Sequence, residues 1–167
     1  DRLVHCAVAD ALVNRYRDRY PAIPAYWKHM ERILDAMIRG EDVAFGAHGI
    51  MRTGKECVWM PNGLPIRYHG LGRDEQGQAS YFNGHERVKI YGGLLTENLT
   101  QSLHRSIVAG QMLEIAEVLK IGCMTHDDIV AVVPDDSAEL SLQFMVQTMG
   151  KVPEWAIGLP LIGEGKI

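Results

Sequence analysis

The sequence predicts an α+β fold, and three observations support this prediction. Apolar residues recur at helical spacing within residues 24–38 and again within residues 95–119. Residues 41–93 lose that spacing and are rich in glycine, while two short β-prone runs flank a polar turn near residue 126. With 167 residues, of which 47% are hydrophobic, the chain is long enough to build a hydrophobic core.

The first segment, residues 1–40, is expected to form two helices. Residues 4–20 are apolar with interleaved charges, and Pro21 should end that helix. A second helix is expected at residues 24–38, with Gly40 just beyond its end.

The second segment, residues 41–93, is expected to be an irregular β segment. Short strands are predicted at residues 43–45, 57–59, 65–68 and 88–91. The run Pro61-Asn62-Gly63 predicts a turn between two of them, and residues 74–78 predict a polar loop.

The third segment, residues 94–167, begins with a long helix predicted at residues 96–120, with Thr96 as its N-cap. Glu97, Gln101 and Arg105 are spaced by four and therefore share one side of this helix. A β-hairpin, a helix that follows residues 135–137 and extends to about residue 149, and a short strand at residues 159–161 should complete the segment.

The turn of the predicted hairpin carries Thr125-His126-Asp127-Asp128 between two apolar runs. Adjacent carboxylates beside buried strands are costly unless they bind a positive partner such as a divalent cation. The simplest alternative is an ordinary turn, because Asp is a common turn residue. A metal-dependent phosphohydrolase of the His-Asp type is disfavoured, because that fold is helical and needs further ligands on neighbouring helices.

Composition limits the setting of the protein. No apolar run is long enough to span a membrane. Cys6, Cys57 and Cys123 are odd in number and widely spaced, so neither a disulfide framework nor a zinc site is expected, and a reducing intracellular setting fits best. The first residue is Asp1 and not Met, so we expect a piece of a longer polypeptide.

Several runs, in the same order along the chain, resemble family A DNA polymerases of the polymerase I type, in phage-like form. Residues 91–101 (YGGLLTENLTQ) resemble a helix start of that family, and residues 123–130 (CMTHDDIV) resemble its His-Asp-Glu hairpin. Residues 13–17 (VNRYR), 20–23 (YPAI) and Trp27 resemble the stretch behind the nucleotide-binding fingers helix. Residues 155–161 (WAIGLPL) with Glu164-Gly165 resemble the closing segment.

The resemblance implies a palm-type antiparallel β-hairpin packed on long helices. Residues 1–40 would be rear fingers helices, residues 41–93 the irregular β segment and residues 94–167 the palm, all within one polymerase fragment. The implied function is template-directed DNA synthesis by two-metal-ion nucleotidyl transfer, in the cytoplasm of a bacterial or phage-infected cell. The implied partners are primer-template DNA, deoxynucleoside triphosphates and the remainder of the polymerase chain.

The resemblance also implies roles for individual residues. Asp127 would be a direct ligand of Mg²⁺ and, with Asp128, a catalytic residue. The DNA-binding residues would be His126 near the primer end, Gln101 in the minor groove, Asn98 close to the family's companion position, and Arg105 at the DNA backbone. Glu97 competes with Asn98 for its position, and Arg105 could instead brace the hairpin carboxylates. An amide suits the minor groove, because its acceptors are nearly the same for every base pair.

Two departures from the family pattern stand out. Asp128 occupies a position where Glu is usual, and Leu64 follows the Pro-Asn-Gly turn where Arg is usual, with Arg67 nearby. The family's second metal-binding Asp and its Arg/Lys/Tyr nucleotide helix are not in this sequence, so the isolated chain is expected not to extend primers. A non-catalytic, prophage-derived nucleic-acid-binding remnant is the main alternative. The aromatic residues Tyr16, Tyr20, Trp27 and Trp59 are expected to pack in or near the core rather than to stack on bases.

Overall fold

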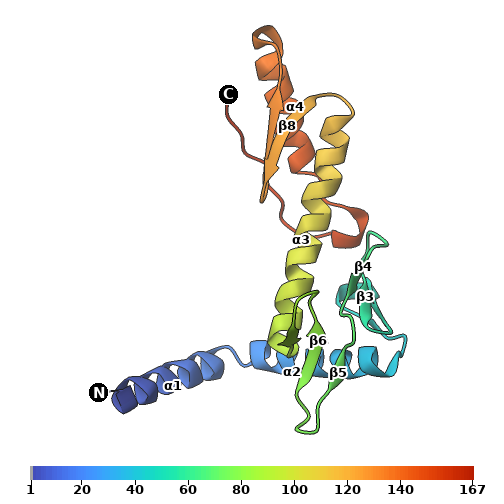
Figure 1. Ribbon diagram of the computed structural model, residues 1–167. Helices are drawn as coiled ribbons and strands as arrows, with labels where there is room; N and C mark the ends of the chain where they lie inside the picture. Colours follow the sequence, from blue (N-terminus) through green and yellow to red (C-terminus); the bar gives the residue numbers. More distant parts are fainter. Residues whose placement is uncertain (1) are drawn as a thin grey trace. The chain divides into compact units, whose positions relative to one another are not determined.

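The computed structural model describes residues 2–167, with side chains from residue 8 onward. Helices are combined with antiparallel sheets, which confirms the predicted α+β class. The chain divides into two compact units, unit 1 up to Leu99 and unit 2 from Thr100, and the division falls within one long helix (Figure 1). No helix in the described range is long and apolar enough to cross a membrane. Cys57 and Cys123 are free, and the side chain of Cys6 lies outside the described residues.

Unit 1 opens with the two predicted helices, α1 (Arg2–Arg19) and α2 (Ala22–Arg39). The second helix starts two residues earlier than expected, so Pro24 falls in its first turn, where a missing N–H costs no helical hydrogen bond. Gly40 ends α2 in the left-handed region at φ 72°, as its position predicted. The buried face of α2 consists of Met30, Ile33, Leu34, Ala36 and Met37.

A four-stranded antiparallel sheet, which we call sheet A, follows α2. Its strands, in spatial order, are β1 (Ala44–Phe45), β2 (Met51–Gly54), β3 (Cys57–Trp59) and β4 (Pro65–Arg67), and a short 3-10 helix, η1 (Ala47–Gly49), joins the first two. Strand β2 contacts α2 and is buried at Met51 and Thr53. Sequence reasoning missed β2, whose buried positions carry only one large apolar side chain.

A three-stranded sheet, sheet B, contains β5 (Gly72–Arg73), β6 (Ala79–Phe82) and β7 (Arg87–Lys89). The backbone joins the two sheets, since Tyr68 N–H donates to Glu56 O and Phe82 N–H donates to His69 O, both at 2.8 Å. The predicted loop at residues 74–78 is a tight turn, because the Asp74 carboxylate accepts the N–H groups of Gln76 and Gln78. Strands β5 and β6 were not predicted, because they are short and flank this polar turn.

The long helix α3 (Gly92–Ala116) starts four residues before its predicted start, so the assignment of Thr96 as N-cap is wrong. Thr96 lies inside the helix, and its hydroxyl donates to the Gly92 carbonyl at 2.7 Å. The Glu31 carboxylate, from α2, accepts the Gly92 N–H at 2.7 Å and thereby satisfies a free donor at the helix start. A Cβ at Gly92 would lie 2.0 Å from the Trp27 carbonyl oxygen, so only glycine allows α2 and α3 to approach this closely.

Unit 2 contains the predicted hairpin, β8 (Lys120–Thr125) and β9 (Asp128–Val132), followed by the 3-10 helix η2 (Asp135–Ser137) and the helix α4 (Ala138–Met149). Helix α3 ends at Ala116 rather than at residue 120, because Lys120 already belongs to β8. A 3-10 helix, η3 (Glu154–Ala156), precedes the tail. The strand predicted at residues 159–161 is wrong, since Leu161 N–H turns back to Leu159 O at 3.0 Å and these residues pair with no strand of the described structure.

Candidate functional site

The hairpin of unit 2 places its polar residues at its tip. Strand pairing runs from Lys120 opposite Val132 to Thr125 opposite Asp128, with a β-bulge between Ile121 and Cys123. His126 and Asp127 are therefore the two turn residues, and Asp128 is the first residue of β9. This two-residue connection fixes the register of the whole hairpin.

The turn itself is strained at His126. This residue adopts φ 54°, in the left-handed region that glycine or asparagine usually occupies. Such a conformation costs an L-residue about 1–2 kcal/mol. His126, Asp127 and Asp128 are all exposed. The turn therefore presents one imidazole and two carboxylates to solvent in consecutive positions.

The two faces of the hairpin differ in character. Met124 lies opposite Ile129 on the half-buried face, whereas Thr125 lies opposite Asp128 on the exposed face. Arg105, on α3, approaches the half-buried face, with its Nη1 atom 3.5 Å from the Met124 Sδ atom. Arg105 thus contacts a thioether of the hairpin, and no ion pair joins it to a carboxylate of the described residues.

The other two predicted DNA contacts lie on either side of the unit boundary. Gln101 is exposed on α3, one turn before Arg105. Asn98 belongs to unit 1 and is half-buried, and its Nδ2 atom donates to the Tyr68 hydroxyl at 3.2 Å. Burial raises the pKa of Tyr68 to about 12, against a smaller lowering by the hydrogen bond from Asn98. The Asn98 amide is therefore engaged with a core tyrosine.

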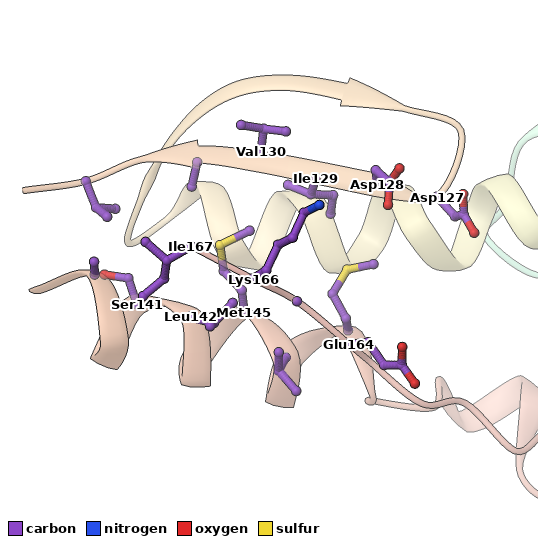
Figure 2. Close-up of a pocket in the computed structure, with 16 residues that line it drawn as sticks. Asp127, Asp128, Ile129, Val130, Ser141, Leu142, Met145, Glu164, Lys166 and Ile167 are labelled. Carbon is purple, nitrogen blue, oxygen red and sulfur yellow. The ribbon is translucent and has the colours of Figure 1, made fainter. Parts of the chain in front are cut away.

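A cavity of about 600 Å³ adjoins the hairpin within unit 2. Its walls are the hairpin, α4 and the tail, and Asp127 and Asp128 line one end (Figure 2). The tail contributes Glu164 and Lys166, and the Lys166 side chain extends toward the hairpin. The cavity thus combines an apolar floor from α4 with charged groups of both signs.

Close packing of the tail on α4 forms one wall of this cavity. A Cβ at Gly163 would lie 2.4 Å from the Val146 carbonyl oxygen, and one at Gly165 would lie 2.6 Å from the Leu142 Cδ1 atom. Gly163 allows the tail to lie against the backbone of α4, and Glu164 follows it in the lining of the cavity. Sequence reasoning did not connect Glu164 or Lys166 with the hairpin, because their separation from it in sequence leaves no local pattern.

The hairpin carboxylates have the ligand chemistry of a hard cation. Mg²⁺ is bound in proteins by one or two carboxylates together with water and substrate phosphate oxygens. Asp127 and Asp128 offer two such groups in adjacent positions. Within the described part of the chain, no three His, Cys, Asp or Glu side chains converge closely enough to hold a metal ion. A metal at this turn would therefore use water, phosphate oxygens or residues from elsewhere as its remaining ligands.

Comparison with known proteins adds one distant relative. No family model matches the chain, and no solved structure matches it. The chain is 27% identical, over 168 aligned positions, to a protein named DNA polymerase from Bacillus phage SP02. The alignment covers 92% of this chain and 26% of that protein, so the chain spans about a quarter of its relative's length. The similarity links the chain, at a distance, to a phage protein of DNA synthesis.

Proposed function

We propose that this chain is part of a DNA polymerase and that the hairpin of unit 2 carries its metal-binding carboxylate. The observation that carries the proposal is the alignment with the phage DNA polymerase over 92% of the chain. The exposed sequence His126-Asp127-Asp128 at a hairpin tip supports it, because a catalytic carboxylate must reach a bulky substrate such as DNA. The type of polymerase proposed is family A, with the hairpin as part of its palm.

The two carboxylates take different parts in this proposal. Asp127, a turn residue at the tip, is the proposed Mg²⁺ ligand. Asp128 begins β9 and projects to the exposed face. Its side chain is shorter than the Glu that is usual at this position, and it is proposed to support the metal site or the substrate from one side. Bound Mg²⁺ would supply Lewis-acid stabilisation of the phosphate that undergoes transfer. In this proposal Asp127 and Asp128 bind the cation, and the pairing of β8 with β9 fixes the positions of the two residues.

The proposed DNA contacts lie on the hairpin and on α3. His126 is held by the strained turn at the tip and is proposed to contact the primer end. Gln101 and Arg105, exposed on α3, are proposed to contact the minor groove and the backbone, respectively. Asn98 is proposed as a secondary contact only, because its Nδ2 atom already donates to Tyr68.

The isolated chain holds too few carboxylates at the hairpin for the proposed reaction. Two carboxylates on one hairpin supply too few ligands for two metal ions, so further ligands must come from other residues of a longer protein. The substrates proposed for that longer protein are primer-template DNA and deoxynucleoside triphosphates. We expect the 167-residue chain alone to show no primer extension in Mg²⁺, and robust synthesis by it would contradict this expectation.

The decisive experiment uses the complete reading frame that contains this sequence. Asp127→Asn should reduce primer extension by at least about 10³-fold while leaving DNA affinity within a few-fold, because only metal binding is removed. Asp136→Asn is the matched control, since Asp136 is also an exposed acid and lies on η2, away from the turn. Unchanged extension by the Asp127 variant would refute the assignment. DNA binding without extension by the unmodified protein would favour the non-catalytic remnant.

A further inference from the structure

One exposed face of sheet A combines an aromatic ring with two arginines. In the strand register, Arg52 lies opposite Trp59, Trp59 lies opposite Pro65, and Arg67 follows Pro65 by two positions on the same strand. Directly paired residues and residues two apart point to the same side of a sheet. We call this surface the Trp59 face and define it by Arg52, Trp59, Pro65 and Arg67.

Trp59 is both exposed and fixed. Its exposed fraction is 43%, so it lies at the surface, whereas the sequence predicted packing in or near the core. A Cβ at Gly54 would lie 3.2 Å from the Trp59 Nε1 atom and 3.0 Å from the Cys57 Sγ atom, so the indole lies directly over a glycine of the neighbouring strand. The opposite side of the sheet is buried at Thr53 and Val58, which anchors the strands beneath the ring.

The two arginines of the Trp59 face differ in their partners. Arg52 forms an exposed two-point ion pair with Asp42, at 2.9 and 2.6 Å. Arg67 is exposed, and its guanidinium forms no ion pair or hydrogen bond with another described residue. The other strand positions on this side, Ala44, Gly54 and Cys57, carry no carboxylate. One free guanidinium therefore lies diagonally across from an exposed indole.

We propose that the Trp59 face binds single-stranded nucleic acid, with a base stacked on Trp59 and adjacent phosphates held by Arg67 and Arg52. Stacking on aromatic rings within a positively charged groove is the general means of binding single strands without sequence preference. An acidic peptide would satisfy the arginines but would leave the indole without a planar partner. The inference rests on unit 1 alone and does not require the hairpin of unit 2 to be catalytic.

The test measures binding of a fluorescein-labelled twelve-nucleotide oligo(dT) to the 167-residue chain by anisotropy at low salt. Trp59→Ala should weaken binding roughly ten-fold, whereas Trp59→Phe should weaken it less than about three-fold. Tyr26→Ala is the matched control, because Tyr26 is 42% exposed on α2, and it should leave binding unchanged.

Arg67→Ala should lower the slope of log affinity against log salt by about 0.7, the value for one contact with single-stranded phosphate. Arg32→Ala, an exposed arginine on α2, should not change that slope.

Three results would overturn the proposal. The first is equal binding by Trp59→Ala and the unmodified chain. The second is equal or tighter binding of a duplex of the same length, since stacking on Trp59 needs an open base. The third is competition by polyglutamate that depends on Trp59 as strongly as the oligonucleotide does, which would favour an acidic peptide. If circular dichroism shows that Trp59→Ala does not fold, intrinsic tryptophan fluorescence provides the test instead. Addition of oligo(dT) should quench the fluorescence of the unmodified chain and should not quench that of Trp59→Phe. Failure of primer extension in the complete protein leaves these binding results unaffected, so the two proposals fail separately.

Discussion

The Nδ2 atom of Asn98 donates a hydrogen bond to the hydroxyl of Tyr68, at 3.2 Å. The two residues come from α3 and from the segment that joins sheets A and B. Tyr68 is 1% exposed and its ring meets Tyr81 edge-on, at a centroid distance of 5.1 Å. This contact connects the start of α3 to both sheets of unit 1.

Tyr68 should make the stability of unit 1 sensitive to alkaline pH. Burial raises its pKa from 10.0 to about 12, so the folded state holds the phenolic proton more tightly than the unfolded chain. The corresponding stabilisation is complete below pH 10 and is lost as the pH rises toward 12, to an extent of about 2–3 kcal/mol. Urea unfolding between pH 8 and pH 12 measures it.

The control for this prediction is Tyr68→Phe, which removes the titrating group. The variant should lose about 1 kcal/mol at pH 8, because the Asn98 amide loses its acceptor, and its stability should fall less between pH 10 and pH 12. Parallel pH profiles for the two proteins would show that Tyr68 does not account for the alkaline loss.

Gly92→Ala should destabilise unit 1 by more than about 3 kcal/mol, because its Cβ would fall 2.0 Å from the Trp27 carbonyl oxygen and neither backbone can yield cheaply. Gly110→Ala is the matched control in the same helix. A Cβ at Gly110 meets no atom within 4 Å, and alanine is the better helix former by about 1 kcal/mol. Thermal denaturation should therefore lower Tm for the first variant and leave or raise it for the second.

The Glu31 carboxylate should contribute more to unit 1 than the Asp35 carboxylate. Both accept from the Arg73 guanidinium, at 3.1 and 2.8 Å, but Glu31 also accepts the Gly92 N–H. Glu31→Gln should cost about 1 kcal/mol and Asp35→Asn less than that, since partly exposed ion pairs contribute little. Chemical denaturation of the two variants compares them, and an equal or reversed order would argue against capping of α3 by Glu31.

His126→Gly separates the strain of the hairpin turn from the chemistry of the imidazole. Glycine accepts φ 54° without steric cost, so the variant should raise hairpin stability by up to about 1 kcal/mol, measured as slower amide exchange in β8 and β9. In the complete protein the same variant should lose primer extension if the imidazole contacts the primer end. His126→Asn, which tolerates this conformation, should keep the stability and lose the activity.

Mn²⁺, a paramagnetic substitute for Mg²⁺, should broaden the amide resonances around Asp127 in the isolated chain. Two carboxylates predict weak binding, and Asp127→Asn should remove most of the broadening while Asp136→Asn preserves it. Uniform broadening of all exposed acids would mean that the hairpin tip is not a selective site.

Local patterns in the sequence predicted much of the fold. Gly40 at the end of α2, the turn at Gly63 and the hairpin around His126 were all predicted correctly, because each depends on residues within a few positions of one another. The order of motifs also linked the chain to a DNA polymerase, and the distant phage relative supports that link.

Contacts between residues far apart in the chain, such as that of Asn98, leave no local pattern. Its position in the sequence is close to the family's companion position, and its contact with DNA stays a prediction. The hydrogen bond from its amide to Tyr68, thirty positions away, could not be predicted, because no local pattern records that partner. The predicted start of α3 was wrong for the same reason. The N–H group of Gly92 is satisfied by the Glu31 carboxylate from α2 and not by Thr96.

The sequence by itself determined the α+β class, most helix positions and the tip of the hairpin, because helix periodicity and turn chemistry are local. The tertiary structure alone decided which glycine begins α3, which side of the hairpin meets Arg105, and that Trp59 stays exposed between two arginines. Those outcomes depend on close approach and strand register between residues far apart in the chain. Packing forces of that kind act across space and leave no period in the sequence.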